Sequence, residues 1–108
     1  MSHVTAHVLD ARLGRPAGKV SVSLSDDAGR LVADAITDDD GRVSSLGPDR
    51  LEAGTYTVRF GSGDYFAAQH VACFHPHVLV VFSVDADGEH YHIPLLLSPY
   101  SYTTYRGS

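Results

Sequence analysis

Histidine is the side chain in this sequence best suited to proton transfer near neutral pH, because its ordinary pKa is about 6.5. The 108 residues include seven histidines and carry a formal net charge of −5. Spacing favours two of them for function, His7 and His92, since each lies in a strand-like stretch. His3 lies near the terminus, where we expect a frayed and inert side chain. The remaining histidines flank a loop or neighbour His92, and they are His70, His75, His77 and His90.

Two sets of residues have the alternating spacing of metal ligands on one face of a strand. Cys73, His75 and His77 form a Cys-x-His-x-His set, and His90 with His92 forms a His-x-His pair. Ligands that alternate in this way can bind Zn²⁺. No carboxylate or second thiol falls at a usual ligand spacing, so we expect no bound metal. A metal-binding β-sandwich remains the weaker alternative.

Arg42 is a third candidate and directly follows a turn with the sequence Asp39-Asp40-Gly41. Its guanidinium could form a surface ion pair with these aspartates, or its planar fork could bind carboxylate-like or enolate oxygens of a substrate. The spacing alone does not decide between these roles. The sequence has no Gly-x-Ser-x-Gly elbow and no glycine-rich phosphate loop, and Cys73 is more typical of a structural thiol.

Short strands separated by turns must position these side chains. Apolar residues alternate with serine over Val20–Ser25, which is the period-2 pattern of a half-buried strand. Turn residues recur at short intervals, so the sequence predicts an all-β sandwich of seven to eight strands in a single domain, residues 1–108. Asp64–Val71 is predicted to form one short helix with Asp64 as its N-cap. The other predicted strands are Val4–Leu9, Leu31–Thr37, Tyr56–Phe60, Val78–Asp85, His90–Leu97 and Ser101–Arg106.

Alternation along the strands also predicts which candidates face outward. His90 and His92 alternate with an apolar set, so both should lie on the solvent side of their strand. The same reasoning turns His7 outward, and it places Tyr105 on the outward side of the last strand. Strand order, which alternation cannot supply, decides whether these side chains meet. The residues expected to face the core are Val4, Ala6, Val8, Tyr91, Ile93, Leu95, Tyr100, Tyr102 and Thr104.

The composition excludes several classes of function. Thirteen acidic residues outnumber eight basic ones, so no basic face for nucleic acid is expected. No apolar run approaches the roughly 20 residues that span a bilayer, and the first residues lack the pattern of a signal peptide. The single cysteine excludes an internal disulfide. We therefore expect a cytoplasmic protein that binds neither nucleic acid nor membrane.

Three segments together resemble one enzyme family. They are the opening Thr5–Asp10 with Gly14–Ala17, the central Asp40–Arg42, and the final His90–Ser108. This combination is similar to the 5-hydroxyisourate hydrolases, the transthyretin-like enzymes of urate breakdown. The last four residues, Tyr105-Arg-Gly-Ser108, are the most specific part of the resemblance, because they mark the enzymes and are lacking in the hormone carrier transthyretin.

The resemblance implies catalytic roles for His7, Arg42, His92 and Ser108. His7 and His92 would position and deprotonate a water molecule, although the resemblance does not say which of them is the base. Arg42 would pair with substrate oxygens and stabilise developing negative charge. The hydroxyl or terminal carboxylate of Ser108 would orient a histidine. The implied reaction is hydrolysis of the N1–C6 ring amide of 5-hydroxyisourate, and it requires no metal or cofactor.

The resemblance also assigns the tail and the assembly. Tyr105 would form a wall of the substrate pocket, and Arg106 and Gly107 would help to close it. In the transthyretin-like two-sheet sandwich, the first, fourth, seventh and eighth strands share one sheet. The outer face of that sheet lines a channel between the dimers of a homotetramer. The alternative function is a transthyretin-like protein that binds a small ligand without reaction.

Overall fold

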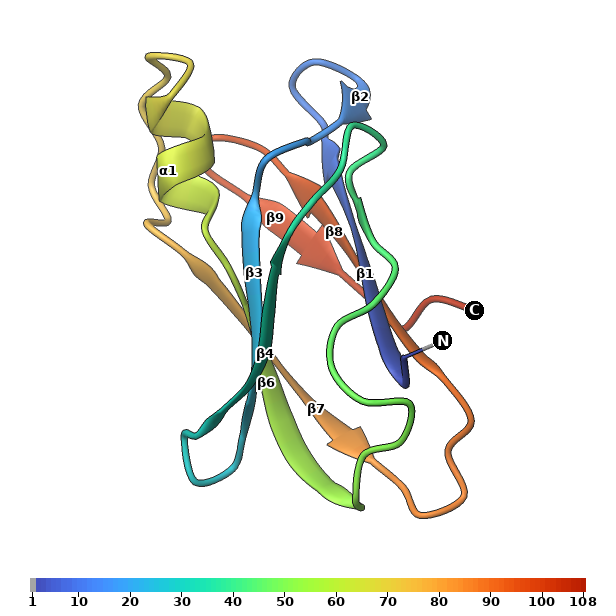
Figure 1. Cartoon of the computed structure of the whole chain (residues 1–108). Helices are drawn as coiled ribbons and strands as arrows, with labels where there is room; N and C mark the ends of the chain where they lie inside the picture. Colours follow the sequence, from blue (N-terminus) through green and yellow to red (C-terminus); the bar gives the residue numbers. More distant parts are fainter. Residues whose placement is uncertain (1) are drawn as a thin grey trace.

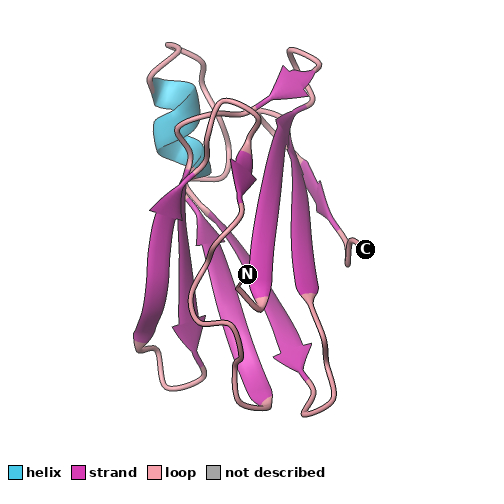
Figure 2. Cartoon of the chain, turned by 45° about the vertical axis from the view of Figure 1, so that its right-hand side comes forward, coloured by secondary structure: helices cyan, strands magenta, loops and turns pink. Residues whose placement is uncertain are grey.

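Two β-sheets pack face to face in the computed structural model, which describes residues 2–108 (Figures 1 and 2). The strands are β1 (Val4–Asp10), β2 (Arg15–Pro16), β3 (Ser21–Asp26), β4 (Leu31–Ile36), β5 (Arg42–Val43), β6 (Gly54–Phe60), β7 (Val78–Val84), β8 (Tyr91–Leu97) and β9 (Tyr102–Thr104). The first sheet has the order β2-β1-β8-β9, and β5 also pairs with β1. The second sheet has the order β4-β3-β6-β7. The two-sheet sandwich expected from the sequence is therefore confirmed.

The strand order of the first sheet agrees with the order that the resemblance implied. With the two-residue strand β2 set aside, this sheet contains the first, fourth, seventh and eighth strands of residues 2–108. β1 and β8 are parallel along their whole length. β5 is antiparallel to β1 and pairs His7 with Arg42. The sheet thus places β5, β1 and β8 side by side.

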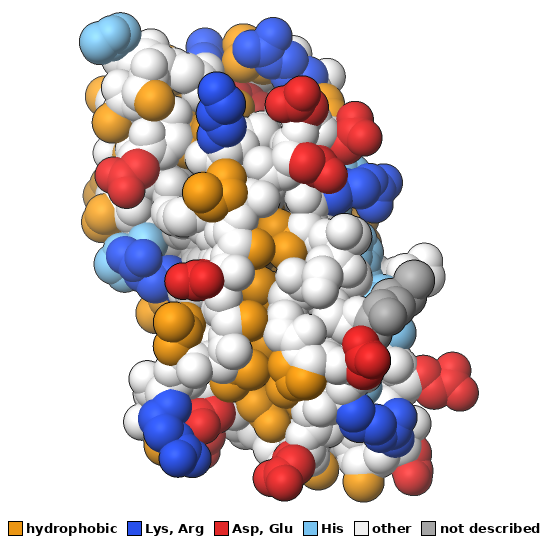
Figure 3. All heavy atoms as spheres, viewed as in Figure 1, with side chains coloured by type: hydrophobic (Ala, Val, Ile, Leu, Met, Phe, Trp, Pro, Cys, Tyr) orange, Lys and Arg blue, Asp and Glu red, His pale blue; other side chains and the backbone are white. Residues whose placement is uncertain are grey.

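The core lies between the two sheets and contains the strand residues that alternation assigned to it. Every second residue of β1 is buried, and so are Tyr91, Ile93 and Leu95 of β8. His7 and His92, at the opposite parity, are only half-buried. On the face seen in Figure 3, apolar side chains form a band down the middle, and charged side chains surround this band at the edges and both ends. The candidate histidines therefore lie on the outer side of the first sheet.

The helix begins earlier and is shorter than the sequence predicted. α1 spans Ser62–Ala67 instead of Asp64–Val71, and its N-cap residue makes no side-chain hydrogen bond. The backbone N–H of Gly63 donates to the Pro76 carbonyl at 2.8 Å, so contact with a neighbouring loop fixes the start of the helix. Asp64 lies in the first turn, where its negative charge is favourable. Over residues 2–108, no helix is long and apolar enough to cross a membrane.

Two predictions about the ends of the chain are wrong. His3 is buried, because its Nδ1 accepts a hydrogen bond from the Leu51 N–H and its ring packs edge-on against Tyr91. Tyr100 and Tyr102 are 69% and 39% exposed instead of facing the core. β9 is only three residues long and lies at the edge of its sheet, so these two rings remain beyond the core.

Candidate active site

Three of the candidates selected from the sequence lie on neighbouring strands of the first sheet. His7 is on β1, Arg42 begins β5 and His92 is on β8. The register makes His7 the direct cross-strand neighbour of Arg42, and the ring centroids of His7 and His92 are 6.5 Å apart. Because β1 lies between β5 and β8, the sheet brings together residues that are far apart in the sequence.

A cavity of about 220 Å³ opens among these strands. Arg42, His92 and Ser108 line it, so the end of the chain reaches the same site as the strands. His7 flanks this cavity through the ring of His92 rather than lining it. The other lining residues are Thr5, Ala6, Val43, Ser44 and His90.

Asp38 holds the turn that presents Arg42. Its carboxylate accepts hydrogen bonds from the backbone N–H groups of Asp40 and Arg42, both at 2.9 Å. The carbonyl of Gly41 accepts a hydrogen bond from the Val8 N–H at 2.7 Å, which attaches the turn to β1. Gly41 has a φ of +74°, and a Cβ there would collide with the Val8 carbonyl oxygen. Only glycine therefore fits this turn.

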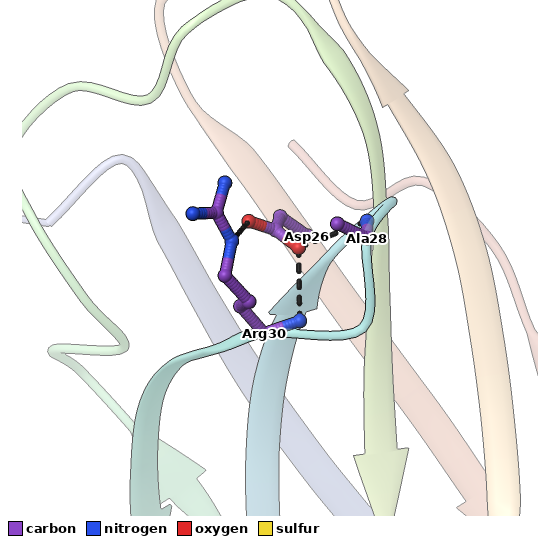
Figure 4. Close-up of polar contacts among 3 residues, drawn as sticks. All are labelled: Asp26, Ala28 and Arg30. Atoms are coloured by element: carbon purple, nitrogen blue, oxygen red, sulfur yellow. Dashed lines mark hydrogen bonds and ion pairs between the residues drawn. The ribbon is translucent and has the colours of Figure 1, made fainter.

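The chain contains a second copy of this turn, Asp26–Arg30, between β3 and β4 (Figure 4). The carboxylate of Asp26 accepts hydrogen bonds from the backbone N–H groups of Ala28 and Arg30, at 3.0 and 2.9 Å. The bond from the Arg30 N–H is the main cause that lowers the pKa of Asp26. Arg30 Nε also folds back onto the same carboxylate at 3.2 Å.

Arg42 differs from Arg30 in what its guanidinium contacts. Arg30 forms an ion pair with the aspartate of its own turn. No ion pair joins Arg42 to an acidic group anywhere in residues 2–108, although Asp38 occupies the matching position. The ion-pair interpretation left open by the sequence therefore applies to Arg30 and not to Arg42. The guanidinium of Arg42 is available to a ligand in the cavity.

His7 has a defined tautomer when neutral. Its Nε2 lies 2.9 Å from the backbone carbonyl oxygen of Asp40. A carbonyl only accepts hydrogen bonds, so Nε2 carries the hydrogen and the lone pair is on Nδ1. The same bond attaches the His7 ring to the turn that carries Arg42, which fixes the two side chains relative to each other.

His92 is half-buried and its Nδ1 lies 2.7 Å from the hydroxyl oxygen of Thr5. Burial is the largest of the causes that lower the pKa of His92, and the charges of His7, His90 and Arg42 lower it further. The ring is therefore neutral at neutral pH, because the ordinary pKa is already about 6.5. Among residues 2–108, its Nε2 has no hydrogen-bond partner. That nitrogen is free to contact water or a substrate.

The end of the chain folds back along β8. The N–H of Gly107 donates to the carbonyl of His92 at 2.9 Å and forms an isolated antiparallel bridge. A Cβ at Gly107 would lie 2.6 Å from Cδ2 of the His92 ring and 3.0 Å from Cγ of Pro94. Glycine thus allows the tail to lie directly against the ring, and Ser108 then reaches the cavity.

Tyr105 and Arg106 do not line the 220 Å³ cavity of Arg42, His92 and Ser108. The guanidinium of Arg106 stacks 4.6 Å from the centroid of the Tyr91 ring and donates to the His90 carbonyl at 3.4 Å. Tyr105 is 58% exposed, and both residues line a different cavity of about 270 Å³ beside β7. Within one chain, neither of them lines the candidate site, and their contacts with substrate remain predictions.

The residues considered as metal ligands are engaged in other contacts. Cys73 Sγ donates to the carbonyl of His75 at 3.6 Å. The ring of His75 packs edge-on against Phe74 and Tyr102, with centroids 5.0 and 4.9 Å away. Over residues 2–108, no three or more His, Cys, Asp or Glu side chains are grouped so that they could hold a metal ion.

The sequence as a whole matches one protein family. The model of the HIUase/transthyretin family matches residues 4–107. The chain belongs to this family. A 5-hydroxyisourate hydrolase of Salmonella typhimurium is 41% identical over 109 aligned positions, which cover 97% of this chain and 80% of that protein.

Two solved structures from the HIUase/transthyretin family resemble this chain equally well. The 5-hydroxyisourate hydrolase of Klebsiella pneumoniae has a TM-score of 0.91 and 34% identity, covering 99% of this chain and all of that one. The transthyretin of Sparus aurata also has a TM-score of 0.91 and 34% identity, covering 99% of this chain and 97% of that one. The backbone therefore does not distinguish hydrolases from transthyretins, and the side chains of the site must do so.

Thr5 is the residue of the candidate site that the sequence reasoning missed. It has the same outward parity as His7 on β1, and the register places it opposite His92 on β8. Its hydroxyl contacts both His90 and His92. In the sequence, the only indication of a role for Thr5 was a hydroxyl side chain two positions before His7. That indication can be interpreted only when β1 is known to pair with β8.

Proposed function

We propose that this protein hydrolyses 5-hydroxyisourate at its N1–C6 ring amide and yields 2-oxo-4-hydroxy-4-carboxy-5-ureidoimidazoline. A relative that aligns with 97% of the chain is named for this activity. The observation that carries the proposal is the cavity lined by Arg42, His92 and Ser108, because it combines an unpaired cation with a neutral histidine. Attack of water on a carbonyl needs such a base and such an anion-stabilising group.

His92 is the proposed general base. Its lowered pKa keeps the ring neutral at neutral pH, and its free Nε2 can take a proton from the attacking water. The water oxygen forms the new bond to C6 of the substrate. The proton then passes to N1 as the C6–N1 bond breaks, so His92 returns to its neutral form. His7, whose Nε2–H is held by the Asp40 carbonyl, orients the water through Nδ1.

Arg42 is proposed to stabilise the negative charge that develops on the C6 carbonyl oxygen. A guanidinium offers two parallel N–H donors to one oxygen group and stays charged at any physiological pH. The Asp38 turn and the Val8–Gly41 hydrogen bond hold Arg42 at the edge of the cavity. No acidic group within residues 2–108 competes for it.

The tail and the assembly complete the proposal. In this proposal Ser108, which lines the cavity together with His92, orients a histidine, and Gly107 lets the tail close over the His92 ring. Tyr105 and Arg106 contact substrate from a neighbouring chain. This requires a homotetramer, a dimer of dimers with its sites at the dimer–dimer interface. The outward position of the site and the exposure of Tyr105 support such an arrangement. The cytoplasmic location stays a prediction.

The proposal is tested by generating 5-hydroxyisourate from urate in situ and following its ultraviolet decay. The protein should accelerate this decay, and Arg42→Gln should lower kcat/KM by at least about a hundredfold, as removal of an oxyanion donor does. Arg30→Gln is the matched control, since Arg30 ends an equivalent turn and does not line the cavity. Equal losses in both variants, or a wild-type protein without any effect on the decay, would contradict the proposal.

Binding of a small ligand without reaction is the second candidate, because a transthyretin superposes as well as a hydrolase. A protein with this function would retain the intact ligand at equilibrium and leave its absorbance decay unchanged. The same in situ assay therefore separates the two functions.

A further inference from the structure

Thr5 lies between the rings of two histidines of the β8 region. Its Oγ1 is 2.7 Å from Nδ1 of His92 and 3.0 Å from Nε2 of His90. The two rings are stacked, with centroids 6.3 Å apart and planes inclined by 22°. Because Thr5 pairs with His92 across the parallel β1–β8 register, the sheet itself fixes the hydroxyl between the rings. None of the roles proposed above uses Thr5 or His90.

The hydrogen count of this arrangement has a consequence for His92. A threonine hydroxyl has one hydrogen, so it can donate to only one of the two rings. If it donates to His92 Nδ1, the neutral His92 carries its hydrogen on Nε2 and cannot take a proton from water there. If it donates to His90 Nε2, His92 can donate Nδ1–H to Oγ1 and keep the lone pair on Nε2.

We propose that Thr5 and His90 are positioning residues that hold His92 in its Nδ1–H tautomer. The hydroxyl of Thr5 accepts from His92 and donates to Nε2 of His90. This inference rests on the proposed hydrolysis, because only that reaction requires an unprotonated Nε2. When Nε2 takes up the proton of water, Nδ1–H still donates to Thr5, so the hydrogen bonds persist through the transfer.

The tautomer can be measured without any substrate. Ring ¹⁵N NMR of the assembled wild-type protein, at a pH where His92 is neutral, should show Nδ1 protonated and Nε2 unprotonated. In Thr5→Val, which keeps the shape but removes the hydroxyl, the His92 signals should shift toward the other tautomer. A wild-type His92 that carries its hydrogen on Nε2 would overturn the inference.

Kinetics test the same inference through the reaction. Thr5→Val should lower kcat about tenfold or more while KM stays within about twofold, and Thr5→Ser should restore most of kcat. A wrong histidine tautomer costs about 10⁴-fold in serine proteases, and a hydroxyl is a weaker orienting group than their buried carboxylate. Thr57→Val, at a half-buried position on β6, is the control for the substitution itself. A wild-type kcat in Thr5→Val would overturn the inference.

His90 supplies an independent variant in case Thr5→Val folds poorly. His90→Phe removes the acceptor of the Thr5 hydroxyl, which then turns to His92 Nδ1, so kcat should fall as in Thr5→Val. His90→Gln offers an amide oxygen in its place and should restore part of kcat. Equal rates in the two His90 variants would count against the arrangement. If the wild-type protein did not hydrolyse 5-hydroxyisourate, the proposed function would fail, while the NMR spectrum would still decide the tautomer.

Discussion

The rings of His7 and His92 are held by partners of different kinds. His7 donates to a backbone carbonyl, which can only accept, so the fold alone determines its tautomer. His92 contacts a hydroxyl, which can donate or accept, so its tautomer depends on what else Thr5 contacts. A base whose protonation site depends on a neighbour is sensitive to substitutions that never touch the substrate.

The pH dependence of kcat/KM should reflect the lowered pKa of His92. Burial and the neighbouring positive groups disfavour its protonated form, so the free enzyme keeps an unprotonated base below the ordinary pKa of about 6.5. We therefore expect kcat/KM to fall as the pH is lowered through the pKa of His92, with the midpoint of this fall below pH 6.5. NMR titration of the His92 ring should give the same midpoint. A kinetic midpoint at or above pH 6.5 would contradict the assignment of His92 as the base.

Gly107→Ala should reduce activity with little loss of stability. The new Cβ would lie 2.6 Å from the His92 ring and displace it, and a misplacement of about 1 Å can cost about a hundredfold in rate. Gly29→Ala is the contrasting control. Gly29 has a φ of +80° with no atom near its Cβ position, so alanine there should cost roughly 1 kcal/mol of stability and leave kcat unchanged. Thermal unfolding and the decay assay on both variants should show opposite patterns.

At the scale of elements, the chain uses one five-residue turn twice for different purposes. The sequences over 26–30 and 38–42 both begin with two aspartates and end with Gly-Arg. In both turns, the carboxylate of the first aspartate accepts hydrogen bonds from two backbone N–H groups, and the backbone carbonyl of that aspartate accepts one from the glycine N–H. Only the second turn is attached to β1, through the Val8–Gly41 hydrogen bond. The same local turn therefore occurs in two places, and only the copy attached to β1 brings its arginine to the cavity of the proposed active site.

Asp38→Ala and Asp26→Ala should therefore have similar effects on stability and different effects on activity. Each substitution removes the acceptor of two backbone N–H groups at an exposed turn, so both should lower the melting temperature slightly. Asp38→Ala should also loosen Arg42 and lower kcat/KM by about tenfold or more, since correct placement dominates such contributions. Asp26→Ala should retain the wild-type kcat/KM. Equal activity in the two variants would show that the turn does not position Arg42.

These elements show which parts of the site the sequence could predict. Alternation correctly places His7 and His92 on the outer side of their strands, because burial of an apolar set fixes the parity. The sequence could not assign a role to Arg42, because the same local sequence precedes Arg30. Arg30 forms an ion pair with the aspartate of its own turn, whereas Arg42 does not. The sequence could not identify Thr5 either, because the partner of its hydroxyl lies 87 positions away. Contacts between strands distant in sequence decide both cases.

At the scale of the whole molecule, two buried polar side chains form hydrogen bonds between the segments that connect the two sheets. Thr37 accepts from the Val20 N–H at 2.9 Å and donates to the Ala17 carbonyl at 2.7 Å, which joins the β2–β3 and β4–β5 connections. His3, which directly precedes β1, joins the β5–β6 and β7–β8 connections in the same way, through Leu51 and Gly88. Each of these residues links, by hydrogen bonds, two segments that run from one sheet to the other. Each therefore contributes to the packing of one sheet on the other.

His3 should be required for stability although it takes no part in the proposed reaction. Its Nδ1 accepts from the Leu51 N–H at 2.9 Å, and its Nε2 lies 2.9 Å from the Gly88 carbonyl, to which it must donate. His3→Ala removes both bonds and leaves a cavity, so we expect a loss of about 3 kcal/mol in the free energy of unfolding. His3→Asn can replace the acceptor at Nδ1, and His3→Gln can replace the donor at Nε2, so each variant should lose less stability than His3→Ala.

Urea unfolding at one fixed protein concentration measures the stability of these variants, because assembly makes stability depend on concentration. His77→Ala, at an exposed position, is the control and should stay within about 0.5 kcal/mol of wild type. A His3→Ala protein as stable as His77→Ala would show that the sheets are held together without this residue.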